Sequence, residues 1–319
     1  MMTTADRAAG VLLGQACGDA LGVPYEFGAR PGPGGPQMVG GGLGPYEPGE
    51  WSDDTQMAIC IARVSASGAD LTSEEALDSI SEGFLDWQLN GATDIGNQTR
   101  RVLGAARRGE GRPAARLQQA AAEDLALSPQ SAGNGALMRT SVVGLSRLDD
   151  RQATARAAAG IAALTHPDPD VVDSCVLWSE AVRRAVADGE LDLLGGLDLL
   201  PAERRDRWRE LIRAAESEPL HTFTPNGWTV TALQAAWGAI QQARRSAPAG
   251  SEMFEVFSAA VGIGDDTDTV AAIAGGLAGG LWGVDALAEE WLSVVHGWPG
   301  MAAADLRELA VSTAEKGRR

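Results

Sequence analysis

The residues best suited to chemistry are two short acidic clusters that lie far apart in the sequence. Ser52-Asp53-Asp54-Thr55 follows a loop rich in glycine and proline, and Asp265-Asp266-Thr267-Asp268-Thr269 comes late in the chain, before an apolar segment. Carboxylate and hydroxyl oxygens are hard donors that suit Mg²⁺ or Mn²⁺. Two such clusters that face each other would hold one or two divalent cations. The sequence therefore predicts a metal site between them.

The first cluster also has a simpler explanation as the beginning of a helix. Ser52 is a good N-cap, and Asp53 and Asp54 would then favour the positive end of the helix dipole. The second cluster argues for the metal, because Asp266 and Asp268 are two positions apart and would not share a helix face. They can converge only from a turn, so the expected site lies where helices begin.

Several other polar segments are candidates with two explanations each. Asp94 precedes a basic helix, and it is either a catalytic acid or the N-cap of that helix. The small-residue turn at 131–137 either presents backbone N–H groups to an anion such as a diphosphate or only joins two helices. His166 closes a helix, where a C-cap is an adequate explanation. Trp228, at a helix entrance, is less certain than the other tryptophans to be internal.

The elements that must position these residues are helices. Apolar residues recur at helical spacing over residues 4–21, 56–65, 74–90, 100–108, 151–164, 171–187, 202–215, 230–244, 252–261, 270–281, 285–295 and 303–315. No segment alternates convincingly as a strand does. We therefore expect a single all-α domain over residues 1–319. Residues 28–50, mostly glycine and proline, form a loop that we interpret as a lid, with Glu26 at its base.

Charge and cysteine content narrow the classes of function. A net charge of −17 would repel a phosphate backbone, so we expect no general nucleic-acid binding. The three cysteines have no C-x-x-C spacing and are expected to be buried thiols in a reducing compartment. The N-terminus lacks the features of a signal peptide, and the longest weakly polar stretch, 270–284, is too short to span a bilayer. The expected location is cytoplasmic, without membrane contact.

Five motifs in order resemble the ADP-ribosylglycohydrolase family, which includes hydrolases of ADP-ribosyl-arginine and ADP-ribosyl-serine. They are Gly14-Gln15-Ala16-Cys17-Gly18-Asp19-Ala20-Leu21-Gly22, Trp51-Ser52-Asp53-Asp54-Thr55, Gly133-Asn134-Gly135-Ala136-Leu137-Met138-Arg139, Leu164-Thr165-His166, and Asp266-Thr267-Asp268-Thr269 with the Ala/Gly segment that follows. The resemblance spans nearly the whole chain. It implies an orthogonal helical bundle with a centre of two Mg²⁺ or Mn²⁺ ions.

Carried over residue by residue, the resemblance implies a role for each candidate. The metal ligands would be Ser52, Asp53, Asp54, Asp266, Asp268 and Thr269. Glu26 matches a mobile acidic residue near the metals, and Asp94 matches the proton-transfer residue of the branch that cleaves an arginine N-glycosidic bond. ADP-ribose, the product, would contact Ser131, Gly133, Asn134, Gly135 and His166, with its adenine stacked on Trp228. The substrate implied is an ADP-ribosylated protein or another ADP-ribosylated molecule.

Three alternatives differ in class. The chain could release ADP-ribose from serine, acyl or nucleic-acid linkages, or bind ADP-ribose without turnover, as crystallin-like relatives suggest. An all-α isoprenoid synthase also binds Mg²⁺ through Asp-rich helices, but its aspartates are spaced to share one helix face. Asp53 and Asp54 are adjacent, and no further Asp stands at Met57 or Ala58. The synthase alternative therefore explains the sequence poorly.

Overall fold

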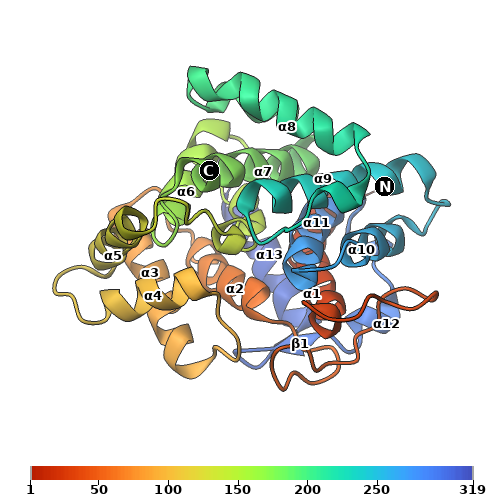
Figure 1. Ribbon diagram of the computed structural model, residues 1–319, viewed down its shortest axis with the longest axis horizontal. Coiled ribbons are helices and arrows are strands. Elements are labelled where there is room, and N and C mark those ends of the chain that lie inside the picture. The colour runs from red at the N-terminus through yellow and green to blue at the C-terminus, as the bar shows by residue number, and fades with distance from the viewer. Residues whose placement is uncertain (1, 318–319) are drawn as a thin grey trace.

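The computed structural model describes residues 2–317, and helices dominate it (Figure 1). The α-helices are α1 (Thr4–Gly22), α2 (Asp53–Ala66), α3 (Glu74–Asn90), α4 (Asn97–Ala106), α5 (Pro113–Leu127), α6 (Arg151–Ala163), α7 (Pro169–Asp188), α8 (Arg205–Ser217), α9 (Thr229–Ser246), α10 (Glu252–Gly262), α11 (Thr267–Trp282), α12 (Glu289–Leu292) and α13 (Ala303–Lys316). Short 3-10 helices join several of them, among them η1 (Val23–Tyr25), η2 (Asn134–Ala136) and η5 (Ala202–Arg204). The only strands in residues 2–317 are β1 (His296–Gly297) and β2 (Met301–Ala302), which pair antiparallel.

The centre of the fold is the contact between α1 and α11. A side chain at Gly10, Gly14 or Gly18 would collide with the backbone of α11, and Gly275 and Gly279 face α1 in the same way. The positions that meet run in opposite order along the two helices, so the helices are antiparallel. The absence of side chains lets two backbones touch, which is the packing reason for the glycines in both sequences.

This antiparallel contact brings the end of α1 against the beginning of α11. Gly22, the last residue of α1, lies directly on the backbone of Asp268, so any side chain at position 22 would displace that residue. Asp19 is one turn earlier in α1. The helix pair thus places an early and a late acidic residue at the same depth in the core.

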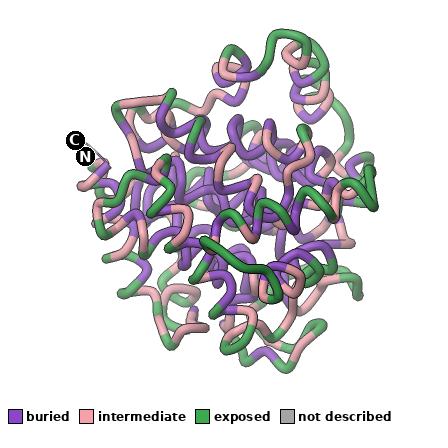
Figure 2. The backbone as a smooth tube through the Cα atoms, turned by 90° about the vertical axis from the view of Figure 1, so that its left-hand side faces the viewer, coloured by how far each residue is buried: buried purple, intermediate pink, exposed green. Residues whose placement is uncertain are grey.

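The remaining helices surround this pair. In Figure 1, α13 and α2 lie near this pair, α3, α4 and α5 lie at the left, and α6 to α9 lie across the upper part with α8 outermost. In Figure 2 the buried segments of the backbone lie mostly in the interior of the molecule, and the exposed segments lie at its periphery. α1 is buried from Ala8 to its end, and α11 is buried from Thr267 to Gly280.

The all-α prediction is confirmed, and most predicted helices are present within a few residues. Two differ. α5 was not predicted, and the helix expected over 285–295 is wrong, because only α12 and a 3-10 turn form there. The predicted buried thiols are confirmed as free, buried cysteines: Cys17, Cys60 and Cys175. No helix in residues 2–317 is long and apolar enough to cross a membrane.

The loop at 28–50 contains no helix or strand but is held at several points. Isolated bridges join Gly41 to Tyr46 and Glu50 to His296, and the Tyr46 side chain is buried. Its glycines with positive φ are Gly35, Gly40, Gly41, Gly42 and Gly49. Left-handed turns therefore account for part of its composition. Movement of this loop as a lid stays a prediction.

Candidate active site

Asp19, on α1, organises one side of the site. Its two carboxylate oxygens accept four hydrogen bonds: Oδ1 from the Ser52 amide and hydroxyl, both at 2.8 Å, and Oδ2 from the Thr55 amide at 3.0 Å and hydroxyl at 2.6 Å. These donors lie at the N-terminus of α2, so Asp19 caps that helix from another element. Burial raises the pKa of Asp19 to about 6, against the effect of these hydrogen bonds. Its oxygens are occupied, which makes it a support rather than a free ligand.

Ser52 stands at the N-cap position of α2, but its side chain does not cap the helix. The hydroxyl instead lies 2.8 Å from Asp19 Oδ1, 3.2 Å from Asp54 Oδ2 and 3.4 Å from Asp268 Oδ2. The explanation of Ser52 as an ordinary side-chain cap is therefore wrong, because Asp19 already binds the amides at this helix end. Ser52 is held among three carboxylates.

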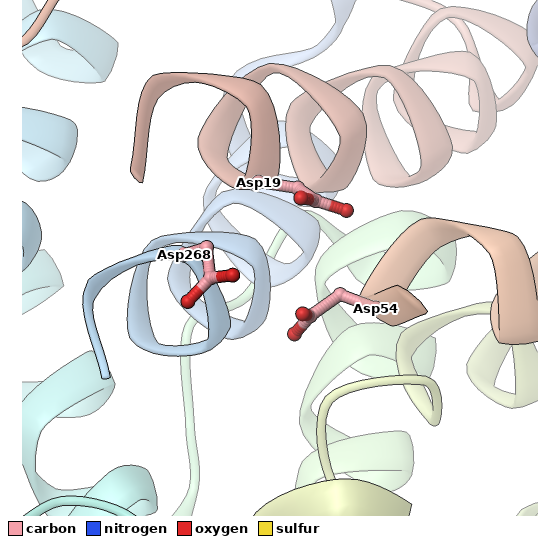
Figure 3. Close-up of side chains that lie close together, drawn as sticks. All are labelled: Asp19, Asp54 and Asp268. Carbon is pink, nitrogen blue, oxygen red and sulfur yellow. The ribbon is translucent and has the colours of Figure 1, made fainter. Parts of the chain in front are cut away.

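Asp54 and Asp268 complete this group of oxygens (Figure 3). Carboxylate oxygens of Asp19, Asp54 and Asp268 lie within 4.8 Å of one another, from α1, α2 and α11. Asp54 Oδ1 is buried and has no hydrogen-bond partner among the described residues. Burial first, and then neighbouring carboxylates, raise the pKa of both Asp54 and Asp268 well above the usual range. An orphaned hard oxygen among crowded anions fits a divalent cation.

A second group shares Asp268. Carboxylate oxygens of Glu26, Asp266 and Asp268 also lie within 4.8 Å of one another. Burial, then the charges of Asp266, Asp94 and Asp53, raise the pKa of Glu26 to about 9. Asp266 is fixed by a 2.8 Å hydrogen bond from Asn134 Nδ2. These residues would also hold a cation.

The backbone next to this second group is strained. Phe27 and Asp265 are the non-glycine residues with positive φ among those described, at 46° and 59°. They are joined directly, since the Phe27 amide donates to the Asp265 carbonyl at 2.7 Å. Each precedes or follows an acidic residue of the group, Glu26 or Asp266. Left-handed backbone at non-glycine residues costs free energy and concentrates at functional sites.

Asp53, Thr269 and Asp94 lie on the cleft above these groups. The cleft has a volume of about 470 Å³, and its lining includes Glu26, Asp53, Asp94, Asp268 and Thr269. Burial, followed by the charges of Asp94 and Asp19, raises the pKa of Asp53 to about 8. The Thr269 hydroxyl donates to Asp54 Oδ2 at 3.4 Å. All six predicted metal ligands thus surround one region.

Asp94 is not the N-cap of the following helix. That position belongs to Gly96, and in the described part of the chain Asp94 Oδ1 accepts one hydrogen bond, at 2.7 Å from the adjacent Ile95 amide. The interpretation of Asp94 as a plain cap is therefore wrong. Asp94 lines the same cleft as Glu26 and Asp53, and its charge contributes to the raised pKa of both. Asp94, the residue predicted for proton transfer, lies outside the two groups of candidate metal ligands.

The turn at 131–137 forms the neighbouring wall. It contains the short 3-10 helix η2, and a second 3-10 helix, η3 (Ser141–Leu145), follows it. The Asn134 side chain bonds Asp266 and, at 3.1 Å, the Asn226 carbonyl, while its amide bonds the Gly227 carbonyl at 3.1 Å. Asn134 therefore ties the turn to the acidic group. Gly135, in the first turn of η2, has an amide without an acceptor from that helix.

His166 lines the cleft beside this turn. The side chain does not cap α6, whose C-cap is Leu164; its Nδ1 lies 2.7 Å from the Thr165 hydroxyl. The C-cap explanation is therefore wrong. A Cβ at Gly135 would lie 3.2 Å from His166 Nε2, so glycine leaves the ring edge open to the cleft. Burial, with the charges of Arg139 and Arg101, lowers the pKa of His166 well below its usual range.

Ser131 and Trp228 line a second cavity of about 620 Å³. It adjoins the first cleft, because Asn97, Gln98, Gly133 and Gly227 line both. Trp228 is 41% exposed, whereas Trp51, Trp87, Trp178, Trp208 and Trp237 are buried. An open indole beside a small-residue turn offers a flat apolar surface to a ring.

A family model described as ADP-ribosylglycohydrolase matches residues 1–319. The chain belongs to the ADP-ribosylglycohydrolase family. ADP-ribosylarginine hydrolase Tri1 of Pseudomonas putida (strain GB-1) is 30% identical over 296 residues, which cover 91% of this chain and 74% of that protein. ADP-ribosyl-(dinitrogen reductase) glycohydrolase of Rhodospirillum rubrum is 28% identical over 297 residues, 90% of each. A solved ADP-ribosylglycohydrolase-related protein complex aligns with a TM-score of 0.71 and 26% identity, covering 99% and 100% of the two chains.

Membership of the ADP-ribosylglycohydrolase family supports a hydrolase that acts on an ADP-ribosyl group.

Sequence reasoning missed Asp19, Asn226 and Gln15 as residues that build the site. Gln15 Nε2 bonds the Asp54 carbonyl at 3.0 Å, and Asn226 Oδ1 accepts from the Asp266 amide at 2.9 Å. The available signal was a polar residue inside an otherwise apolar helix, Gln15 and Asp19 in α1. Asn226 had no comparable signal.

Proposed function

We propose that this protein is a metal-dependent hydrolase that removes ADP-ribose from a modified target by cleaving an N-glycosidic bond to arginine. The observation that carries the proposal is the two clusters of carboxylates that share Asp268, together with the unpartnered Asp54 Oδ1, beside a cleft that Asp94 also lines. The names of the two relatives, an ADP-ribosylarginine hydrolase and an ADP-ribosyl-(dinitrogen reductase) glycohydrolase, support the arginine linkage.

Two Mg²⁺ or Mn²⁺ ions would be held by Ser52, Asp53, Asp54, Asp266, Asp268 and Thr269, with Glu26 beside them. Bound divalent cations orient ribose hydroxyls and make water a better nucleophile at the anomeric carbon. Asp19 and Asn134 do not contact substrate in this proposal. They hold Ser52 and Asp266 in place through hydrogen bonds that are already made.

Asp94 is the proposed general acid and base. Hydrolysis breaks the bond between the anomeric carbon and the guanidino nitrogen, forms a bond from that carbon to the water oxygen, and moves one proton from water to the nitrogen. Asp94 lines the cleft, and among residues 2–317 its carboxylate accepts a single hydrogen bond, from the Ile95 amide to Oδ1. A free carboxyl oxygen is therefore available to carry that proton.

The two adjoining cavities support a substrate that extends away from the acidic floor. The diphosphate would lie along Ser131, Gly133 and Gly135 near His166, and the adenine would stack on Trp228. Gly133 and Gly227 line both cavities, and a Cβ at Gly227 would meet no atom within 4 Å, which supports an open path between them. The total volume suits a dinucleotide-sized group better than a single sugar.

The deciding experiment is a substrate panel with matched metal conditions. Arginine-, serine-, acyl- and nucleic-acid-linked ADP-ribose would each be incubated with Mg²⁺, with Mn²⁺ and with chelator, and released ADP-ribose measured. We expect release from arginine only, and only with metal. Release from another linkage would replace the arginine assignment. Binding of ADP-ribose without release from any substrate would make the protein a non-catalytic binder.

A further inference from the structure

Two large apolar side chains, Phe27 and Leu43, line the cleft and yet remain exposed. Their relative exposures are 63% and 57%, and they line the same cleft as Asp94. Burial of such side chains would favour folding, so their exposure contributes little to the stability of the protein. Single exposed apolar residues are common on protein surfaces, and exposure alone does not indicate a site. The backbone of Phe27 supplies a second reason.

Phe27 has a φ of 46°, in the left-handed region that bulky residues rarely adopt. The surrounding chain holds it there, because the Phe27 amide donates to the Asp265 carbonyl at 2.7 Å and the Gly28 amide donates to the Tyr25 carbonyl at 3.0 Å. A glycine would adopt this backbone at lower cost. Phenylalanine at this position costs free energy that its exposed ring does not return through burial. Such strain at a cleft points to a function for the side chain.

The loop at 28–50 positions Leu43 through the glycine on either side of it. A Cβ on Gly42 would lie 2.3 Å from the Val23 carbonyl oxygen, in the 3-10 turn just before the strained phenylalanine. A Cβ on Gly44 would lie 2.8 Å from Cγ2 of Thr93, which directly precedes the proposed proton carrier. Leu43 therefore lies between the segment of the strained phenylalanine and the segment of the proton carrier.

The side chain of a substrate arginine has a matching order of groups. Its guanidinium is polar and planar, and three methylene groups that pack readily on apolar surface join it to the target backbone. In the proposed reaction the guanidino nitrogen lies near Asp94, so the methylene groups must leave the cleft past its neighbours. Phe27 and Leu43 line the cleft there. A serine linkage has one methylene group and would bring the target backbone to this position instead.

We propose that Phe27 and Leu43 are specificity-determining residues that pack against the methylene chain of the substrate arginine. They favour an arginine leaving group over one without that chain. The inference rests on the proposed function, because it names the part of the substrate that departs. The ADP-ribosyl group lies on the other side of the broken bond, so its affinity does not depend on this pair.

The test compares two conjugates that differ only in the leaving group. ADP-ribosyl-arginine carries the methylene chain and ADP-ribosyl-guanidine lacks it, and release of ADP-ribose from each would be measured with Mg²⁺ and with Mn²⁺. We expect kcat/KM of the wild type to be about tenfold higher for the arginine conjugate, the effect of burying roughly two methylene groups. The ratio is the readout, because a displaced Glu26 would slow both reactions equally.

Substitutions assign the ratio to the two side chains. Phe27→Gly removes the ring and suits the left-handed backbone, so it should lower the ratio about threefold without lowering Tm. Adding Leu43→Ala should bring the ratio close to one, and Phe27→Tyr should keep the wild-type ratio. Phe254→Ala is the matched control, because Phe254 is an exposed phenylalanine that packs on Gly35 of the same loop but lines a different pocket. It should leave the ratio unchanged.

The outcomes separate this inference from the proposed function. Equal kcat/KM of the wild type for the two conjugates overturns the inference and leaves the proposed function standing. A wild-type ratio in the double variant of Phe27 and Leu43, or an equal loss in Phe254→Ala, also overturns it. A Tm of Phe27→Gly well below that of the wild type would show that the ring serves folding, against the inference. No release from either conjugate overturns the proposed function and this inference together.

Discussion

The floor of the cleft, which is the acidic region around Asp268, and its wall, which includes His166 and Gln98, differ in charge and in hydrogen bonding. At the floor, Asp54 and Asp268 are buried with like charges, and Asp54 Oδ1 has no partner. At the wall, His166 and Gln98 are neutral, and their inner atoms are bonded to Thr165. The floor therefore carries crowded buried carboxylates that a bound cation would neutralise, whereas the wall carries no such charge, although Gln98 Oε1 also has no hydrogen-bond partner among the described residues. Under the proposed function, the floor would neutralise the charge of a bound cation, and the uncharged wall would contact the rest of the ligand.

The largest expected effect comes from removing metal or one shared ligand at the floor. Stripping metal, or Asp268→Asn, should lower turnover by at least about 10³-fold, because divalent cations contribute several kcal/mol to such reactions. ADP-ribose release and bound metal would be measured together. Glu82→Gln, an exposed acid-to-amide change on α3, is the control and should change neither. Full turnover by a metal-free sample would show that the carboxylates of the floor need no cation for activity.

Asp94 should have the next largest effect, because it lines the same cleft and is the proposed proton carrier. Asp94→Asn should reduce release from arginine-linked ADP-ribose by about 10²–10⁴-fold, since the amide cannot carry a proton. ADP-ribose affinity, measured by calorimetry, should stay near that of wild type. Wild-type turnover by this variant would leave Asp94 without a chemical role and would weaken the arginine assignment.

At the far end of the wall, Trp228 should affect binding more than chemistry. Trp228→Ala should weaken ADP-ribose binding about tenfold, since stacking of a base on an aromatic ring is worth about 1–3 kcal/mol. Trp228→Tyr should recover most of the loss because the flat ring is retained. A kcat that falls with an unchanged KM in Trp228→Ala would contradict the stacking role.

The smallest effects are on stability, and they should have opposite signs in the two regions. In metal-free protein, Asp268→Asn should raise Tm, because one of the crowded buried charges is removed, whereas Thr165→Val should lower it by breaking a satisfied network. Each shift should be a few degrees, at about 2–4 °C per kcal/mol. Differential scanning calorimetry would measure both. Added Mg²⁺ should raise Tm of wild type and not of Asp268→Asn.

Much of the floor could be predicted from the sequence, because its residues occur as two compact clusters of one chemical type. Ser52 to Asp54 and Asp266 to Thr269 do meet, as expected from helix entrances. Asp19 could not be ranked in the same way. It is an isolated carboxylate among mostly small and apolar residues in the second half of α1, and its four donors come from Ser52 and Thr55.

The sequence by itself determined the helical fold, the acidic clusters and the glycine faces of α1 and α11, since these follow from local periodicity and residue type. Tertiary structure alone decided which carboxylate is saturated and which is free, that Gly96 and not Asp94 caps α4, and which His166 nitrogen faces the cleft. The physical reason is that a hydrogen bond belongs to a pair of groups. For Asp19, Asp54 and His166, donors or neighbouring charges come from helices distant in the chain, and their contacts exist only after α1 and α11 have packed.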